Sequence, residues 1–188
     1  MMECKKALVE TEGNLEKAIE LLRKKGQAKA EKKSGRTTEE GLVATAVSED
    51  NKLAAIVEIN CETDFVAREA RFIDFVSQLA KLALSNKVET VDGLKDIALD
   101  SSTIEAKRLE LVTQLGENIT VRRIQLINAE SGVIASYVHG GSGSARIASL
   151  IALSSDDTAL AQDLAMHVAA MKPDYIDESK IPAAIKDK

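Results

Sequence analysis

One hydrophobic pattern constrains the fold most, because its period changes from two to a helical period within a few residues. Apolar side chains occupy alternate positions over residues 53–59, which predicts a half-buried strand. Apolar side chains then recur at intervals of three and four, which predicts a long amphipathic helix over about residues 66–86. Residues 60–64 are therefore expected to form a strand-to-helix turn, and a rigid scaffold can present such a turn to a partner.

The sequence leaves two interpretations of this turn open. In the first, Thr63 or Asp64 caps the helix by accepting from its free N–H groups, a contribution of about 1 kcal/mol. Phe65 and Val66 then join the core, as apolar side chains usually do. In the second, Phe65 is a wedge that separates helices of a partner, while the carboxylate of Asp64 pairs with a nearby group. The chain has only three Phe, two Tyr and no Trp, so an aromatic beside an acid is informative here.

The run from Glu58 to Arg68, E-I-N-C-E-T-D-F-V-A-R, resembles the signature of the bacterial elongation factor Ts family. The first eight residues, M-M-E-C-K-K-A-L, are similar to the second half of that family's N-terminal signature. The segment L-A-M-H-V-A-A at residues 164–170 resembles a third family segment. The resemblance implies nucleotide exchange on the translational GTPase elongation factor Tu.

The same resemblance implies which residues meet the partner. The turn would enter the GTPase domain near its magnesium site and help to dislodge the ion. His139 lies in a Ser-Tyr-x-His-Gly pattern, whose likeness to a family segment implies contact with a second domain of the GTPase. The implied partner-binding residues are Thr63, Asp64, Phe65 and Val66 in the turn, and Met1, Met2 and His139 outside it. Exchange breaks no covalent bond, so we expect neither catalytic residues nor a cofactor or metal site, and the protein would not be an enzyme.

The expected fold class is α+β: a small helical module similar to a ubiquitin-associated fold, then two related subdomains of antiparallel sheet covered by helices. The expected parts are residues 1–26 (helical module), 27–39 (basic linker), 40–128 (N-terminal core subdomain), 129–175 (C-terminal core subdomain) and 176–188 (tail). Duplication is indicated because a hairpin followed by a helix occurs twice, with L-A-A-I-V at residues 53–57 echoed by I-A-S-L-I at residues 147–151.

Local signals place the elements within this plan. Gly13 suits a left-handed helix C-cap, and Asn14 can cap the next helix. Ser155 or Asp156 can cap a last helix, whose apolar stripe includes His167. In the family, the helical module has a further helix before these two, and the tail is the start of a helical hairpin after which the second subdomain is completed. By that pattern we expect both the module and the second subdomain to be incomplete, and the second sheet to have an open edge.

Composition narrows the function classes. Hydrophobic residues make up 45% and charged residues 29%, which suits a folded soluble protein. No apolar run approaches the length of a membrane span, and a secretory signal is absent, so we expect a cytoplasmic protein. The net charge of −5 and the few aromatics argue against direct nucleic-acid binding. Two reduced thiols, Cys4 and Cys61, are the default, with one disulfide as the alternative.

Basic residues crowd one segment, with Glu31 as the acid among them: Arg23, Lys24, Lys25, Lys29, Lys32, Lys33 and Arg36. A solvated linker helix and a contact with RNA or an acidic protein are both compatible with this charge pattern.

No catalytic constellation stands out in the sequence. The glycines at residues 140–143 lack the Lys of a phosphate-binding loop, and two histidines are too few for a histidine metal site. His139 is expected at an exposed turn or a partner contact, and His167 is expected as a hydrogen-bonded core histidine. A second function class is an adaptor that binds proteins through the first 25 residues without nucleotide exchange. A hydrolase that uses Glu58, Glu62 and Asp64 lacks a nucleophile. A homodimer would require the missing C-terminal region.

Overall fold

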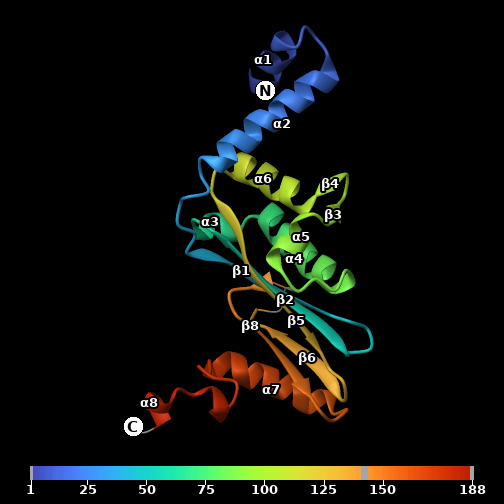
Figure 1. Cartoon of the computed structure of the whole chain (residues 1–188), viewed down its shortest axis with the longest axis vertical. Coiled ribbons are helices and arrows are strands. Elements are labelled where there is room, and N and C mark those ends of the chain that lie inside the picture. Colours follow the sequence, from blue (N-terminus) through green and yellow to red (C-terminus); the bar gives the residue numbers. More distant parts are fainter. Residues whose placement is uncertain (1, 141–143, 187–188) are drawn as a thin grey trace.

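The computed structural model describes residues 2–140 and 144–186. The chain is elongated, with the N-terminal helices at one end, a helix and the C-terminal tail at the other, and the strands between them (Figure 1). Every strand pairing that involves these residues is antiparallel, and helices cover the sheets. The α+β class that the sequence predicts is confirmed.

Two helices form the N-terminal end, α1 (Met2–Glu10) and α2 (Leu15–Glu31). The turn between them contains the predicted caps. Gly13 adopts φ +81°, and its N–H donates to the carbonyl of Leu8 at 2.8 Å. The side chain of Asn14 accepts from the N–H of Lys17 at 3.0 Å. Helix α2 continues to Glu31, so the first residues of the predicted linker are helical.

The main sheet has the order β5-β2-β1-β7. It consists of β1 (Glu40–Val47), β2 (Leu53–Cys61), β5 (Ile119–Asn128) and β7 (Ser144–Ala145). Strands β1 and β2 form the predicted hairpin, in a register that pairs Gly41 with Asn60. A Cβ at Gly41, where φ is +150°, would lie 2.2 Å from the carbonyl oxygen of Ile59. Glycine therefore allows the two strands to approach closely beside the end of β2.

Helices cover one face of this sheet (Figure 1). Helix α4 (Ala70–Ser85) packs on β1 and β2 through the predicted apolar stripe, in which Phe72 and Leu79 are fully buried. Next along the chain come α5 (Val91–Lys95), the short hairpin of β3 (Ala98–Leu99) and β4 (Ser102–Thr103), and α6 (Ile104–Leu115). One hydrophobic core joins these helices to the sheet.

The single helix predicted from about residue 66 is wrong at its start. A four-residue helix, α3 (Asp64–Ala67), precedes α4. Glu69 has extended backbone angles (φ −72°, ψ 129°) and separates the two helices. At about 3.6 residues per turn, Val66 would not share the face of Phe72 and Leu79 on one continuous helix. The break therefore allows both sets of apolar side chains to reach the same core.

The second hairpin is β6 (Val133–Val138) and β8 (Ala148–Leu153), with α7 (Thr158–Met171) packed against both strands. Strand β7 lies between them in sequence but pairs with β1 of the main sheet. The alternation of apolar side chains predicts a strand over residues 146–153, and β8 begins two residues later, at Ala148. The cap of α7 is Asp157, not Ser155 or Asp156. The last described elements are a 3-10 turn (Glu178–Lys180) and α8 (Ala183–Lys186).

The apolar stripe predicted for α7 is only partly correct: Leu164 and Val168 are half-buried, but Leu160, His167 and Met171 are exposed. Small side chains, Ala161, Ala165 and Ala169, face the strands and are buried. They allow the helix to approach β8 so closely that the Ser149 hydroxyl donates to the carbonyl of Ala165 at 2.5 Å. His167 is consequently exposed and is not a core histidine.

Candidate functional site

The predicted turn follows the end of β2, and its apolar residues point in different directions. Phe65 is 80% exposed, whereas Val66 and Ala67 are buried at 7% and 3% exposure. The expectation that Phe65 joins the core is therefore wrong, while the same expectation for Val66 is confirmed. A large aromatic side chain at this exposure lacks the burial that normally stabilises it.

The polar residues of the turn do not act as the predicted helix caps. Thr63 occupies the N-cap position of α3, but its side chain makes no hydrogen bond into the helix. Its hydroxyl donates instead to Oε1 of Glu117 at 2.5 Å, and its N–H donates to Oε2 of the same residue at 2.9 Å. Asp64 pairs with Arg68 one turn later, with 2.8 Å between Oδ2 and Nη2. Both side chains of the turn are thus engaged within the chain.

The carboxylate of Glu62 makes the reciprocal contact, from the turn to the loop that contains Glu117. Oε1 of Glu62 accepts from the N–H of Asn118 at 2.6 Å, so each of the two loops accepts from a backbone N–H of the other. Sequence reasoning missed Glu117 and Asn118. In the sequence these two residues indicate only the end of a helix, and they lie more than 50 residues from the turn. Nothing local in the sequence indicates this pairing.

Cys61 lies directly before the turn and is fully buried. Burial above all, and after it the nearby carboxylates of Glu117 and Glu40, raise the pKa of its thiol from 9.0 to about 12. The thiol donates to the carbonyl of Thr63 at 3.2 Å. Cys4 is exposed, and both cysteines are free, so the alternative of a disulfide is wrong.

The two thiols should therefore differ in reactivity. At pH 8 we expect iodoacetamide to modify Cys4 in the folded protein and to modify Cys61 only after unfolding in urea, because the thiolate is the reactive form. Between about pH 9 and about pH 12 the folded state keeps a proton that the unfolded thiol has lost, so the free energy of unfolding should fall as pH rises. Mass spectrometry of alkylated peptides checks the first result. Equal labelling of both peptides in the native protein would contradict it.

The other predicted contact residues lie on other elements of the chain. Met2 is exposed on α1, at the N-terminal end of the molecule (Figure 1), and Met1 lies outside the described residues. His139 follows β6; its Nδ1 lies 3.1 Å from the hydroxyl of Tyr137, and its N–H donates to the carbonyl of Ile147 at 3.0 Å. The four turn residues therefore lie together. Helix α1 is far from them in the sequence and lies at the N-terminal end of the molecule (Figure 1).

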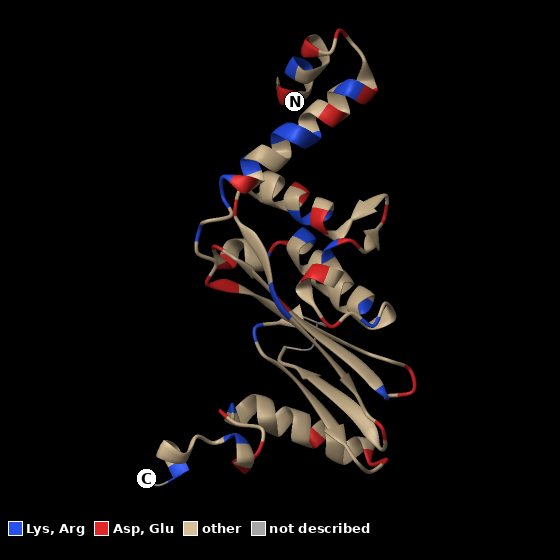
Figure 2. Cartoon of the chain, viewed as in Figure 1, with Lys and Arg blue, Asp and Glu red and all other residues tan. Residues whose placement is uncertain are grey.

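The basic segment makes contacts within the chain. Lys and Arg alternate with acidic residues along α2 in Figure 2. Lys25 pairs with Glu10 at 2.6 Å, and the Lys33 ammonium donates to the carbonyl of Gly116 at 2.6 Å. The first contact ties α2 to α1, and the second ties the segment just after α2 to the loop that contains Glu117. These contacts favour a structural role within the chain for several of the basic residues.

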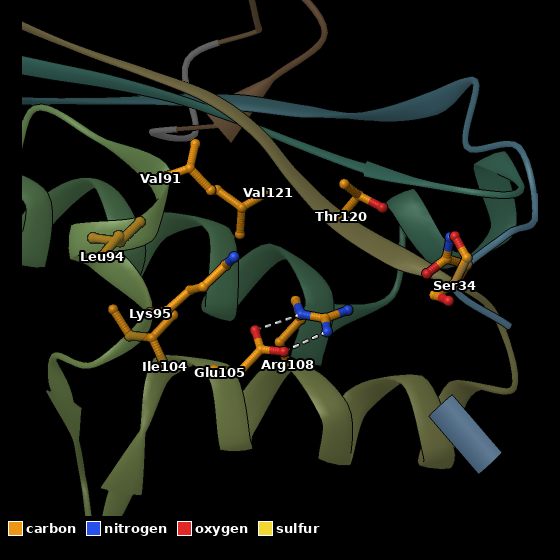
Figure 3. Close-up of a pocket in the computed structure, with 10 residues that line it drawn as sticks. Ser34, Val91, Leu94, Lys95, Ile104, Glu105, Arg108, Thr120 and Val121 are labelled. Carbon is orange, nitrogen blue, oxygen red and sulfur yellow. Dashed lines mark hydrogen bonds and ion pairs between the residues drawn. The ribbon is translucent and has the colours of Figure 1, made fainter. Parts of the chain in front are cut away.

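A hollow of about 260 Å³ lies between α5, α6 and β5. Figure 3 shows that the Arg108 guanidinium and the Glu105 carboxylate form a double contact at its rim, at 2.6 and 2.8 Å. Arg108 also donates to the carbonyl of Ile119 at 2.6 Å. The two charged side chains Arg108 and Glu105 are therefore paired with each other. In the part of the chain that the structure describes, no group of three or more His, Cys, Asp or Glu residues is arranged to hold a metal ion. Nor does any helix there have the length and apolar character that crossing a membrane requires.

Comparisons with known proteins agree with the sequence motif. A family model described as Elongation factor TS matches residues 62–188. An elongation factor Ts of Methylococcus capsulatus is 49% identical over 186 residues, which are 98% of this chain and 62% of that protein. One from Arthrospira platensis is 51% identical over 183 residues, 97% of this chain and 72% of that protein. One from Alkalilimnicola ehrlichii is 46% identical over 188 residues, 100% of this chain and 63% of that protein.

These proteins are longer than the chain. It spans 62% of the length of the first of them and 63% of the third. Their similarity extends across almost the whole of this chain, including the turn and both hairpins.

Proposed function

The chain belongs to the elongation factor Ts family, and we propose on this premise that it is a guanine nucleotide exchange factor of translation elongation. It binds the GTPase elongation factor Tu in its GDP-bound form and promotes GDP release by displacing Mg²⁺. The exposure of Phe65 is the observation that supports this function best. An 80% exposed phenylalanine at the tip of a loop fixed on both sides is suited to insertion into another protein.

In this mechanism Phe65 inserts between helices of the GTPase domain, near its magnesium site. Asp64 redirects groups that hold the water ligands of the ion, and it gives up its pairing with Arg68 to do so. Thr63 and Val66 hold the backbone on either side. His139 contacts a second domain of the GTPase.

The energetics limit what one side chain can contribute. An exchange factor binds the nucleotide-free GTPase more tightly than the loaded form, and the nucleotide then binds more weakly by reciprocity. Each tenfold loosening needs about 1.4 kcal/mol of differential binding. Burial of a phenylalanine is worth roughly 1.5–3 kcal/mol. Phe65 therefore accounts for about one or two decades, and loss of Mg²⁺ together with other contacts supplies the rest.

The finer domain plan is part of the proposal. Helices α1 and α2 belong to a module similar to a ubiquitin-associated fold, in which Met1 and Met2 contact the partner. Two core subdomains, residues 40–128 and 129–175, follow the basic linker. We assign the protein to the cytoplasm, with no direct nucleic-acid contact and no covalent chemistry of its own. A homodimer requires the additional C-terminal region of longer family members.

A second candidate function is an adaptor that binds another protein through the N-terminal helices. Apolar side chains that are more than half exposed on α1 and α2 favour it: Met2, Val9, Leu15 and Ile19. This function would leave nucleotide release unchanged and would make Phe65 irrelevant.

One experiment separates the two functions. Elongation factor Tu from a bacterium is loaded with a fluorescent GDP analogue, and stopped-flow fluorescence records its release after mixing with excess unlabelled GDP. The exchange function predicts that the protein accelerates release in proportion to its concentration until saturation. Identical release with and without the protein would reject the exchange function and favour the adaptor.

A further inference from the structure

The contact between the turn and the loop after α6 begins where the strand ladder stops. Strands β2 and β5 pair as far as Cys61 and Ile119, which are the last partners of their register. One residue further on, the Glu62 carboxylate accepts from the N–H of Asn118. Two residues further on, the Glu117 carboxylate accepts from both the N–H and the hydroxyl of Thr63. Two carboxylates therefore continue a connection that the backbone no longer makes.

Glu62 and Glu117 are called the carboxylate clamp here. Hydrogen bonds to ionised acceptors are stronger than neutral ones, and both members of the clamp are only partly exposed. The loop of Glu117 is itself fixed. The buried Asn118 side chain donates to the carbonyls of Ser34 and Arg36, at 3.3 and 2.9 Å. The clamp thus holds the turn against a loop that is anchored to the basic linker.

The turn needs such support. Helix α3 has four residues, which is too short for a helix to be stable by itself. On its C-terminal side the turn is fixed because Val66 and Ala67 are buried in the core. On its N-terminal side the described hydrogen bonds of Thr63 go to Glu117 and Cys61, with a further backbone bond to Ala67. Phe65 lies between these two anchors and points outward.

We propose that Glu117 is a positioning residue for nucleotide exchange: through Thr63 it fixes the backbone that presents Phe65. This inference rests on the proposed exchange function. Fixing the turn before association lowers the entropy cost of placing Phe65 in its partner. Glu117 acts through Phe65 and makes no contact with the partner itself.

The test compares Glu117→Ala with Glu117→Gln in the GDP-release assay. Alanine removes both hydrogen bonds to Thr63, so we expect release to be slowed on the order of tenfold. Glutamine is the rescue variant, because its Oε1 can accept from the N–H of Thr63 while its Nε2 donates to the hydroxyl. It should release GDP within about twofold of the parent protein. The matched control is Glu110→Ala, which removes an exposed glutamate whose contacts are with Lys107 and Gln114 on its own helix.

A double variant distinguishes positioning from a general structural role. If Glu117 acts through Phe65, Phe65→Ala combined with Glu117→Ala should be no slower than Phe65→Ala alone. Multiplied losses in the double variant would overturn the proposal, as would Glu117→Ala at the parent rate. A glutamine variant as slow as alanine would overturn the hydrogen-bond explanation and the proposal with it.

A measurement without the GTPase keeps this proposal separable from the proposed function. Amide hydrogen exchange at Thr63 should accelerate in Glu117→Ala and not in Glu110→Ala, with the melting temperature recorded for each. If the parent protein does not accelerate GDP release, the exchange function fails whatever Thr63 does. If the parent accelerates release but exchange at Thr63 is the same in all variants, the positioning role alone is overturned.

Discussion

Phe65→Ala is expected to slow the accelerated release of GDP by about tenfold to hundredfold, because it removes about 1.5–3 kcal/mol of differential burial. The free energy of unfolding should change by no more than about 0.5 kcal/mol, because the side chain is 80% exposed and supports little of its own protein's core. Stopped-flow release of a fluorescent GDP analogue measures the first quantity, and urea denaturation measures the second.

Met171→Ala is the matched control for this variant. It removes another large apolar side chain that is 68% exposed, but from the end of α7 rather than from the turn. It should leave GDP release unchanged. If Phe65→Ala releases GDP at the parent rate, the turn is only the start of a helix. If both variants lose activity equally, exposed apolar area matters but its location in the turn does not.

Phe72→Ala is expected to have the opposite effects. Its side chain is fully buried between α4 and the main sheet, and its removal leaves a cavity there. We expect the free energy of unfolding to fall by about 3–5 kcal/mol. Urea denaturation with circular dichroism measures this loss as a lower midpoint at similar slope. At temperatures where the variant remains folded, release of GDP should stay close to the parent rate.

The control for Phe72→Ala lies on the same helix. Lys81 is exposed on α4, and Lys81→Ala should change the free energy of unfolding by no more than about 0.5 kcal/mol. A loss below about 1 kcal/mol for Phe72→Ala would contradict the position of the core between α4 and the sheet. Phe65→Ala and Phe72→Ala are only seven residues apart in the sequence. Together they separate an effect on GDP release from an effect on the free energy of unfolding.

Patterns of short range were readable from the sequence. The alternation before the turn and the stripe of α4 report which side chains face the core, because a strand and a helix repeat with fixed periods. Gly13 and Asn14 marked a helix boundary correctly, since their conformational and capping properties act within a few residues. The run of residues 58–68 likewise indicated the family, because the motif is one contiguous string of residues.

Errors arose where distant segments compete for the same residue. Thr63 looks like a helix cap, but the carboxylate of Glu117 takes its hydroxyl. His167 falls on an apolar stripe, but the alanines beside it give closer packing against β8, so the helix is turned and the histidine is exposed. Strand β7 joins the sheet of the first hairpin rather than the second.

The sequence by itself determined the main strands and helices in their order, the caps at Gly13 and Asn14 and the family to which the chain belongs, because each depends on neighbours along the chain. Tertiary structure decided that Phe65 faces solvent while Val66 is buried, and that Glu62 and Glu117 hold the turn. The physical reason is that a period gives the direction of a side chain only relative to its own element. Whether another segment covers that side chain depends on contacts between residues far apart in sequence, as between Thr63 and Glu117.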